Sequence, residues 1–344
     1  MAADIRKKSV KSNEKKTNKM VMSVSVAKMR WRMLAKALHE GRVSEAGLFM
    51  GSVRRFHHFG LLQLSRVSED AGNQGTSLDF GGHGQQQQQH HWQSHHNTHS
   101  GPDENELDAA WFVAKCLKEP QFSLRVRFLP SQVSINELRG YNNTGNVCLW
   151  PSEEVMAYYA MKNKELFYGK NVLELGGGMT CLAGFTVAAT ARASEVLLTD
   201  GNQRCVANAQ LMLEANRGAF GGCIVHTRRL RWDAENDMND LQARFDVILI
   251  ADCLYFHDGR KPLVHTIWNL LKADGIAVVL APARGDTFQD FVRLATERGF
   301  EADLLMVYDT CVWELHSRYL KEKAHLYDAN LHYPQMLILR KTQN

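Results

Sequence analysis

Residues 171–178 read Asn171-Val-Leu-Glu-Leu175-Gly-Gly-Gly178, a short apolar run that ends in three glycines. A run of this length is typical of a buried strand, and the glycines permit a tight turn and a close approach of a ligand to the backbone. Residues 179–190 continue with helical spacing. The segment therefore predicts a strand, a turn and a helix whose first N–H groups are available to a ligand. Taken alone, it also fits an ordinary strand-to-helix turn.

The same alternation of apolar runs and amphipathic segments continues through the rest of the chain. Strands are expected at 171–175, 195–200, 222–227, 245–250, 275–280, 302–308 and 334–339, and helices at 179–190, 203–216, 259–272 and 286–298. Strands that alternate with helices indicate a mostly parallel sheet covered on both faces. We therefore predict a Rossmann-like α/β fold with a seven-stranded sheet. The last two strands are joined by an irregular stretch without a clean helical pattern, so we expect an antiparallel final strand.

The chain before residue 140 is organised differently. Residues 1–23 form a lysine-rich tail that we expect to be disordered, since it has few large apolar residues. An N-terminal extension follows at 24–140, with a helix expected at 24–39 and strands at 53–64 and 122–129. A Gly-, Gln-, His- and Ser-rich insertion interrupts it at about 70–105. No metal site is predicted from its histidines, because the insertion offers no scaffold to fix ligand geometry. The main domain is expected at 141–344.

Composition limits where the protein acts. The net charge of +4 hides an asymmetry, because residues 1–70 carry 15 Lys and Arg against 6 Asp and Glu. No stretch approaches the roughly 18 apolar residues of a membrane span, and the start lacks the apolar block of a secretory signal. The seven cysteines form no disulfide pattern. We expect a cytoplasmic monomer, with the nucleus as a second location.

Two carboxylates flank the glycine turn. Glu174 stands on an otherwise apolar strand, where an unpaired charge would be costly. The ammonium of a methionine moiety is one candidate partner for it, and a loop amide is the structural alternative. Asp200 ends the next expected strand, where an acid can accept both hydroxyls of a ribose. An acid before the turn favours S-adenosylmethionine over a dinucleotide, whose pyrophosphate is anionic.

Two later strand ends add candidate residues. Trp232 follows the third expected strand, where its ring can cover an adenine; the alternative is a loop tryptophan packed on the domain. Ala251, Asp252 and Tyr255 follow the fourth strand, next to the point where the strand order reverses. Substrate is expected to enter there. The structural alternatives are a helix N-cap for Asp252 and a packed ring for Tyr255.

Residues 172–178, 198–200, 230–233 and 252–255 together resemble the protein-lysine methyltransferases of the seven-β-strand family, and residues 140–282 carry most of the similarity. The resemblance implies methyl transfer from S-adenosylmethionine to a lysine side chain, with Tyr255 lining the lysine channel and Asp252 orienting the amine. It implies a cofactor shell made of Trp150, Gly176, Gly177, Gly178, Asp200, Trp232 and Ala251. The family commonly reads Gly-Ala-Gly-Thr-Gly in the turn, whereas this chain has Thr180 in place of the last glycine.

The basic residues of segment 28–66 suit an acidic protein partner such as calmodulin, since complementary charge speeds encounter and selects partners. They include Lys28, Arg30, Arg32, Lys36, Arg54 and Arg55. Nucleic acid is the competing partner, because the same side chains can contact phosphates. The lack of aromatic residues among them and the negative main domain argue against it. A methyltransferase that acts on another protein, RNA or a small molecule is one alternative function, and an inactive scaffold is another.

Overall fold

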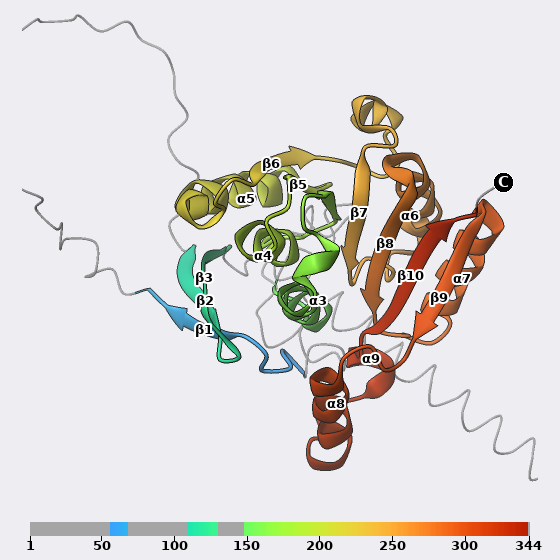
Figure 1. Ribbon diagram of the computed structural model, residues 1–344. Helices are drawn as coiled ribbons and strands as arrows, with labels where there is room; N and C mark the ends of the chain where they lie inside the picture. The colour runs from blue at the N-terminus through green and yellow to red at the C-terminus, as the bar shows by residue number, and fades with distance from the viewer. Residues whose placement is uncertain (1–55, 68–108, 130–147, 343–344) are drawn as a thin grey trace, which may run out of the picture.

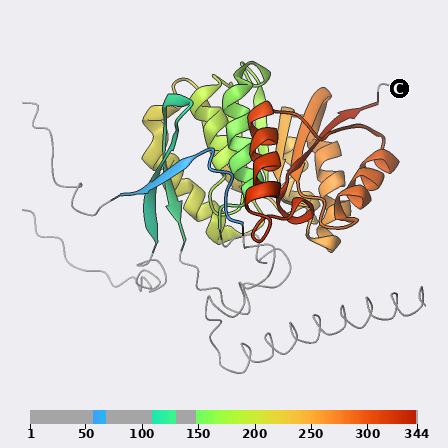
Figure 2. The ribbon, with the colours of Figure 1, turned by 90° about the horizontal axis from the view of Figure 1, so that it is seen from below.

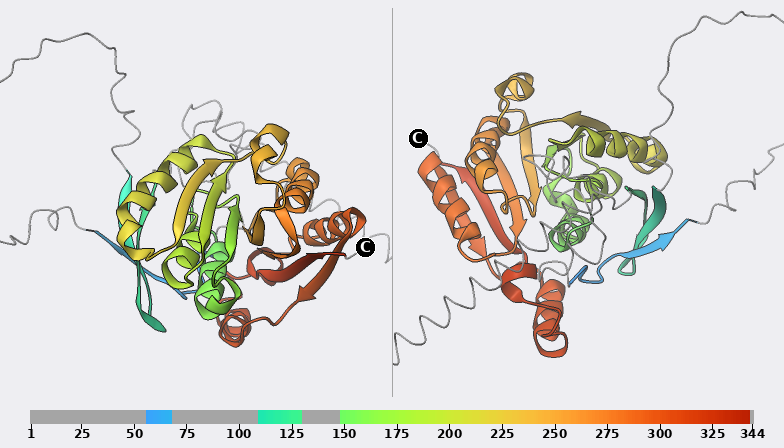
Figure 3. Two further views of the ribbon diagram at one scale, coloured as in Figure 1. Left: turned by 45° about the horizontal axis from the view of Figure 1, so that its top comes forward. Right: turned by 180° about the vertical axis from the view of Figure 1, so that it is seen from behind.

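The computed structural model describes residues 56–67, 109–129 and 148–342, which form two sheets (Figure 1). The expected tail at 1–23, the helix at 24–39 and the insertion at 70–105 lie outside these ranges. The smaller sheet is antiparallel, in the order β1 (Gln63–Arg66), β2 (Ala110–Cys116) and β3 (Glu119–Phe128). It lies on the side of the molecule away from β9, as the right view of Figure 3 shows.

The larger sheet has seven strands in the order β6-β5-β4-β7-β8-β10-β9. They are β4 (Asn171–Leu175), β5 (Glu195–Asp200), β6 (Ile224–Arg229), β7 (Phe245–Ala251), β8 (Leu271–Ala281), β9 (Phe300–Leu305) and β10 (Gln335–Lys341). The first five pair in parallel, and β10 runs antiparallel to both β8 and β9. The predicted fold class and the antiparallel final strand are confirmed. The strand order reverses between β4 and β7, which places the ligand edge at their carboxyl ends.

Helices cover both faces of this sheet. They are α3 (Pro151–Lys162), α4 (Leu182–Thr190), α5 (Gln203–Asn216), α6 (His257–Leu270), α7 (Thr287–Arg298), α8 (Thr310–Glu322) and α9 (Ala329–His332). Because side chains alternate along a strand, neighbouring residues enter different cores. Val172 belongs to a core that also contains residues of α3, α4, α5 and α8, whereas Leu173 and Leu175 belong to a core with residues of α6 and α7. A near-continuous apolar strand is the pattern that a sheet covered on both faces requires.

The small sheet is held to the main domain by amides of α5. Asn208 donates to the carbonyl oxygens of Arg127 and Met179 at 2.9 and 2.7 Å. Asn216 exchanges hydrogen bonds with the backbone of Arg125. Figure 2 shows β2 and β3 beside α5. The extension is thereby joined to the helix that follows β5 and to the turn that contains Met179.

The secondary structure predicted from the sequence was wrong in four places. The strand expected at 53–64 begins only at Gln63, because the N–H groups of Phe59, Leu61 and Leu62 donate to the Glu154 carboxylate and not to a neighbouring strand. The stretch between the last two strands contains α8 and α9. Its buried face carries His316 and Tyr319, which do not form an aliphatic stripe.

The third error was the omission of α3, whose residues are buried on nearly every side, so that its sequence shows no amphipathic period. Strand β2 was also missed, and the strand expected at 122–129 is observed as β3. No helix within the described ranges is long and apolar enough to cross a membrane.

Candidate active site

The sequence-predicted site residues meet at one edge of the large sheet. Leu175 pairs with Thr199 of β5 and with Ile250 of β7, so the residues that follow these three positions emerge side by side. Helix α3 begins at the same edge, where Trp150 is its N-cap residue. The strands β7 and β8 point toward this edge in Figure 1. The glycine turn, Asp200 and the segment after Ala251 therefore line one site.

The glycine turn is closely packed. Gly176 and Gly178 have φ angles of 68° and 59°, which favour glycine over residues with a side chain. A Cβ atom on Gly176 would lie 2.7 Å from Cys253 Sγ and 2.9 Å from the Trp232 ring. A Cβ atom on Gly177 would lie 2.6 Å from Cys181 Sγ. The glycines are therefore needed for contacts with the chain itself, and they also leave the backbone accessible at the sheet edge.

Asp200 is buried and closes the turn. Its carboxylate accepts hydrogen bonds from the N–H groups of Gly178 and Asn202, at 2.9 and 2.8 Å. Burial raises the pKa of Asp200 to about 6, and the backbone donors oppose that rise. The acid predicted to accept ribose hydroxyls thus lies directly against the glycines. Its contact with ribose stays a prediction.

Glu174 is also buried, and its observed partner is a backbone amide. Its Oε2 atom accepts a hydrogen bond of 2.9 Å from Gly184 N in the first turn of α4. A Cβ atom on Gly184 would lie 2.7 Å from the same oxygen, so the close approach depends on glycine. Within the described residues, Oε1 of Glu174 has no hydrogen-bond partner. The structural alternative raised for Glu174, an amide partner, is therefore observed, and one oxygen remains for a further donor.

Glu153 is a site residue that the sequence analysis missed. Its carboxylate accepts hydrogen bonds from Thr180 Oγ1 at 2.6 Å and from Leu182 N at 2.7 Å. Burial raises the pKa of Glu153 to about 7, and the nearby charges of Asp200 and Asp252 add to this effect. The signal that could have revealed α3 is Trp150-Pro-Ser-Glu-Glu154, with proline at the first helical position and acids in the first turn.

Asp252 marks the other side of the site. It has a left-handed φ of 57° and is buried. Its carboxylate forms a two-point ion pair with Arg284, with contacts of 2.7 and 2.8 Å. Burial raises the pKa of Asp252, whereas the Arg284 guanidinium lowers it. The N-cap of α6 is Phe256, so the alternative interpretation of Asp252 as a helix cap was wrong.

The rings of Trp150 and Tyr255 flank this ion pair. The guanidinium carbon of Arg284 lies 5.8 Å from the centre of the Trp150 ring and 5.9 Å from that of Tyr255. These distances fall within the range of cation–π contacts. The structure therefore brings together three residues predicted from sequence, and it adds Arg284, which no local motif had indicated.

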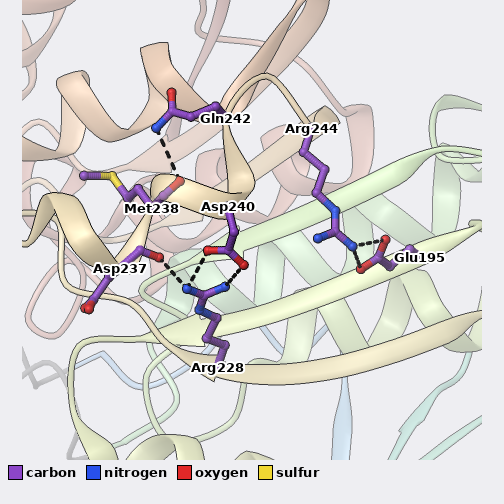
Figure 4. Close-up of polar contacts among 7 residues, drawn as sticks. All are labelled: Glu195, Arg228, Asp237, Met238, Asp240, Gln242 and Arg244. Carbon is purple, nitrogen blue, oxygen red and sulfur yellow. Dashed lines mark hydrogen bonds and ion pairs between the residues drawn. The ribbon is translucent and has the colours of Figure 1, made fainter.

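Trp232 is buried against Gly176 and Gly259, so it is not a ring on the outer surface. Its loop is held by Arg228, which makes two hydrogen bonds of 2.7 and 2.8 Å to Asp240 and one of 2.9 Å to the Asp237 carbonyl oxygen (Figure 4). Asp237 in turn accepts a hydrogen bond from the backbone N–H of Arg231. The position of the tryptophan thus depends on a side chain that leaves the end of β6.

The charges at this edge distinguish between nucleotide ligands. The buried carboxylates are Glu153, Glu174, Asp200 and Asp252. Two of them already accept the N–H groups of Leu182 and Gly184 at the start of α4, the groups that would bind a pyrophosphate. An acidic edge with a glycine turn suits a ligand that carries a sulfonium and an ammonium. The residues therefore fit S-adenosylmethionine, whereas no group of three or more potential metal ligands occurs among the residues described.

This sheet order and this acidic edge with a glycine turn are the arrangement expected of S-adenosylmethionine-dependent methyltransferases. Residues 130–298 match the family described as lysine methyltransferase. A calmodulin-lysine N-methyltransferase of Arabidopsis thaliana is 40% identical over 200 residues, which cover 57% of this chain and 65% of that protein.

A second curated relative and a solved structure show weaker similarity. An electron transfer flavoprotein beta subunit lysine methyltransferase of Rattus norvegicus is 27% identical over 38% of this chain and 47% of its own length. A solved structure of a putative S-adenosylmethionine-dependent methyltransferase from Streptococcus mutans is 15% identical, with a TM-score of 0.44 over 72% of this chain and 58% of that one. The match covers less than two thirds of the length of either curated relative.

Proposed function

We propose that the protein is an S-adenosylmethionine-dependent protein-lysine N-methyltransferase and that calmodulin is its substrate. The observation that carries the proposal is the position of the Asp252–Arg284 ion pair, with Trp150 and Tyr255, at the same sheet edge as the carboxylate-lined glycine turn. The similarity to lysine methyltransferases supports the type of acceptor.

The chain's own groups have separate tasks at the cofactor. Bound S-adenosylmethionine supplies an electrophilic methyl group on a sulfonium. Asp200 would accept ribose hydroxyls, Trp232 would cover the adenine, and the glycine turn with Ala251 would lie against the nucleoside. The unpaired oxygen of Glu174 is available to an ammonium donor, since a buried acceptor without a partner is costly. These carboxylates also make the edge attractive to a cation.

The acceptor side must present a neutral amine. A lysine has a reference pKa of about 10.4, so its neutral form at pH 7.4 costs about 4 kcal/mol. Tyr255 would line the channel and exclude water, and its ring would contact the methylated ammonium. Asp252 would accept a hydrogen bond from the amine and thereby orient its lone pair. No covalent intermediate with the protein is needed.

Calmodulin enters the proposal because of the named relative and because of charge. An acidic protein suits the basic segment 28–66, most of which lies outside the described residues. Action in the cytoplasm, with the nucleus as a second location, and a monomeric state remain predictions.

The proposal is tested by incubating the protein with labelled S-adenosylmethionine and calmodulin purified without lysine methylation. Mass spectrometry should show methyl groups on a calmodulin lysine. A parallel reaction with an RNA extract tests the competing acceptor, and label found only in RNA would overturn the lysine proposal.

Cofactor binding is tested independently by calorimetry with S-adenosylhomocysteine. Asp200→Ala should weaken binding by about 1–3 kcal/mol if the acid accepts ribose hydrogen bonds. Asp303→Ala is the matched control, because Asp303 pairs with Arg340 on the surface. If the wild-type protein did not bind S-adenosylhomocysteine, the alternative function, an inactive scaffold, would be favoured.

A further inference from the structure

Arg284 lies in the loop after β8 and neutralises one particular carboxylate. Its Nη1 and Nη2 atoms lie 2.7 and 2.8 Å from the two oxygens of Asp252, and the two side chains are 15% and 4% exposed. Glu153 and Asp200 accept hydrogen bonds from neutral N–H or O–H donors. Among the four buried carboxylates of the site, and within the described part of the chain, only Asp252 has a cationic partner.

The backbone around Arg284 holds this ion pair in place. Arg284 N donates to the carbonyl oxygen of Asn330 at 2.7 Å, and Gly285 N donates to Asn330 Oδ1 at 3.0 Å. Arg284 has a left-handed φ of 44°, which is uncommon for a residue with a side chain. Such conformations persist where the surroundings impose them. Helix α9, which contains Asn330, therefore sets the direction of the guanidinium.

The ion pair also borders the place where a lysine would enter. The Arg284 guanidinium is within 6 Å of the rings of both Trp150 and Tyr255. A lysine that passes Tyr255 to reach the glycine turn therefore meets Asp252 together with the cation bound to it. The charge that acts on the incoming amine is that of the pair and not that of a lone carboxylate.

The charge of the pair matters because methyl transfer needs a free lone pair on nitrogen. An unopposed carboxylate within about 4–6 Å raises the pKa of an amine by about 1–3 units. The neutral fraction of a bound lysine would then fall about ten- to thousand-fold. A paired carboxylate exerts little net charge, yet its oxygens keep lone pairs that can accept one more hydrogen bond.

We propose that Arg284 is a positioning residue that cancels the charge of Asp252, so that Asp252 accepts a hydrogen bond from a neutral lysine amine and does not hold an ammonium ion. The proton that the lysine carries in solution passes to water before the amine enters the pocket. This inference rests on the proposed lysine methyltransferase function. It assigns a role to Arg284 and explains why Asp252 is buried together with a cation.

Other titratable groups lie near Asp252, and they must be the same in all variants that are compared. Glu153 approaches from α3, and Cys253 and Tyr255 follow Asp252 along its own segment. Asn330, which holds Arg284 from α9, is neutral. Since none of these groups is changed below, their contributions to a pH profile are common to all variants.

The test compares kcat at saturating calmodulin between about pH 6.5 and 10 in four proteins: wild type, Asp252→Asn, Arg284→Met and the double variant. The kcat profile is used because it reports the ionisation of the bound lysine, whereas kcat/KM reports that of the free substrate. In Arg284→Met the unopposed carboxylate should move the rising limb of the pH–rate profile to higher pH by about 1 unit or more. In Asp252→Asn the unopposed guanidinium should move it to lower pH. The double variant, which removes both charges, should return the limb to the wild-type position.

A binding measurement gives a second readout. With S-adenosylhomocysteine bound at pH 7, Arg284→Met should bind calmodulin about tenfold more tightly than wild type, because its pocket accepts the ammonium form. Arg284→Lys keeps a positive charge beside Asp252, so its pH profile should lie closer to that of wild type than the profile of Arg284→Met does. Arg293→Met is the matched control, since Arg293 is exposed on α7 and forms an ion pair with Glu297 of the same helix.

Equal, pH-independent losses in the two single variants and the double variant would show that Arg284 is only structural, and would overturn the inference. Unchanged affinity for S-adenosylhomocysteine in each variant would show that the cofactor side still folds. If wild-type protein methylates no protein in an unmethylated extract, the proposed function fails and this inference fails with it. An active wild type with unshifted variant profiles would overturn this inference alone.

Discussion

The Glu153 carboxylate accepts a hydrogen bond of 2.6 Å from the Thr180 hydroxyl. Thr180 stands where the resembling family commonly has the last glycine of the turn. The same carboxylate accepts the N–H of Leu182, the first residue of α4. The turn is therefore held by α3, a helix that precedes it in the chain, and the missing glycine is replaced by a side chain that donates to that helix.

Glu153 should make the ligand-free protein less stable as pH rises. Its pKa is raised to about 7 by burial, above its ordinary value of 4.5, so folding is favoured by the protonated form. This contribution is complete below about pH 4.5 and is lost as pH rises through 7, at a cost of up to about 3 kcal/mol. Urea unfolding at about pH 5 and 8 measures it.

Glu153→Gln should reduce this pH dependence without removing it, because burial also raises the pKa of Asp200, to about 6. Glu165→Gln is the control, since Glu165 is exposed on the turn after α3. If the free energy of unfolding of Glu153→Gln changed between the two pH values as much as that of wild type, Glu153 would not titrate in this range.

Gly177→Ala should disturb the turn. The new Cβ atom would lie 2.6 Å from Cys181 Sγ and 3.0 Å from Cys181 Cα, so the start of α4 would have to move. We expect a loss of about 1–3 kcal/mol in the free energy of unfolding and weaker binding of S-adenosylhomocysteine. Gly218→Ala is the control, because no atom lies within 4 Å of its Cβ position. Equal behaviour of the two variants would contradict the packing described for the turn.

Glu154→Ala should release the segment before β1. The carboxylate accepts the N–H groups of Phe59, Leu61 and Leu62 at 2.5, 2.7 and 3.1 Å, and these N–H groups have no other acceptor among the residues that the structure describes. Loss of these bonds should lower the free energy of unfolding by about 2–4 kcal/mol and expose residues 56–62 to proteases. Tyr319→Phe removes one neutral bond to the Phe59 carbonyl oxygen and should cost only about 1 kcal/mol. Limited proteolysis that cuts neither variant faster than wild type would refute this role.

Arg228 and Arg244 form similar ion pairs at different places in the fold, so their variants separate the effect of location from the effect of losing an ion pair. Each makes a two-point contact with a carboxylate, Arg228 with Asp240 and Arg244 with Glu195 (Figure 4). Arg228→Met should loosen the loop of Trp232 and weaken binding of S-adenosylhomocysteine by about three- to tenfold. Arg244→Met acts near the amino ends of β5 and β7, where no ligand is expected. Calorimetry that shows the same affinity for both variants would contradict the role given to Arg228.

The sequence alone predicted the main sheet well because most of its elements have local signals. The bounds of β4, β5 and α5 agree with those expected, since each is an apolar or amphipathic run closed by glycine or by a polar cap. In contrast, α3 is buried on nearly every side, so its sequence shows no amphipathic period. Helix α8 is amphipathic, but its buried face consists of Val312, His316 and Tyr319, so few aliphatic residues mark it. The segment 56–62 has apolar residues typical of a strand, but its N–H groups bond to a carboxylate more than 90 residues away.

For the site, the order of residues along the chain was enough to indicate the glycine turn, Asp200 and the segment from Asp252 to Tyr255, because strand ends in a parallel sheet meet at one edge. The pairing of charges depends on tertiary structure. Asp252 and Arg284 are 32 positions apart, and Glu153 and Thr180 are 27 apart. No local periodicity relates such residues; only the packing of α3 and α9 against the sheet edge brings them within hydrogen-bond distance and thereby sets the charge that a substrate would meet.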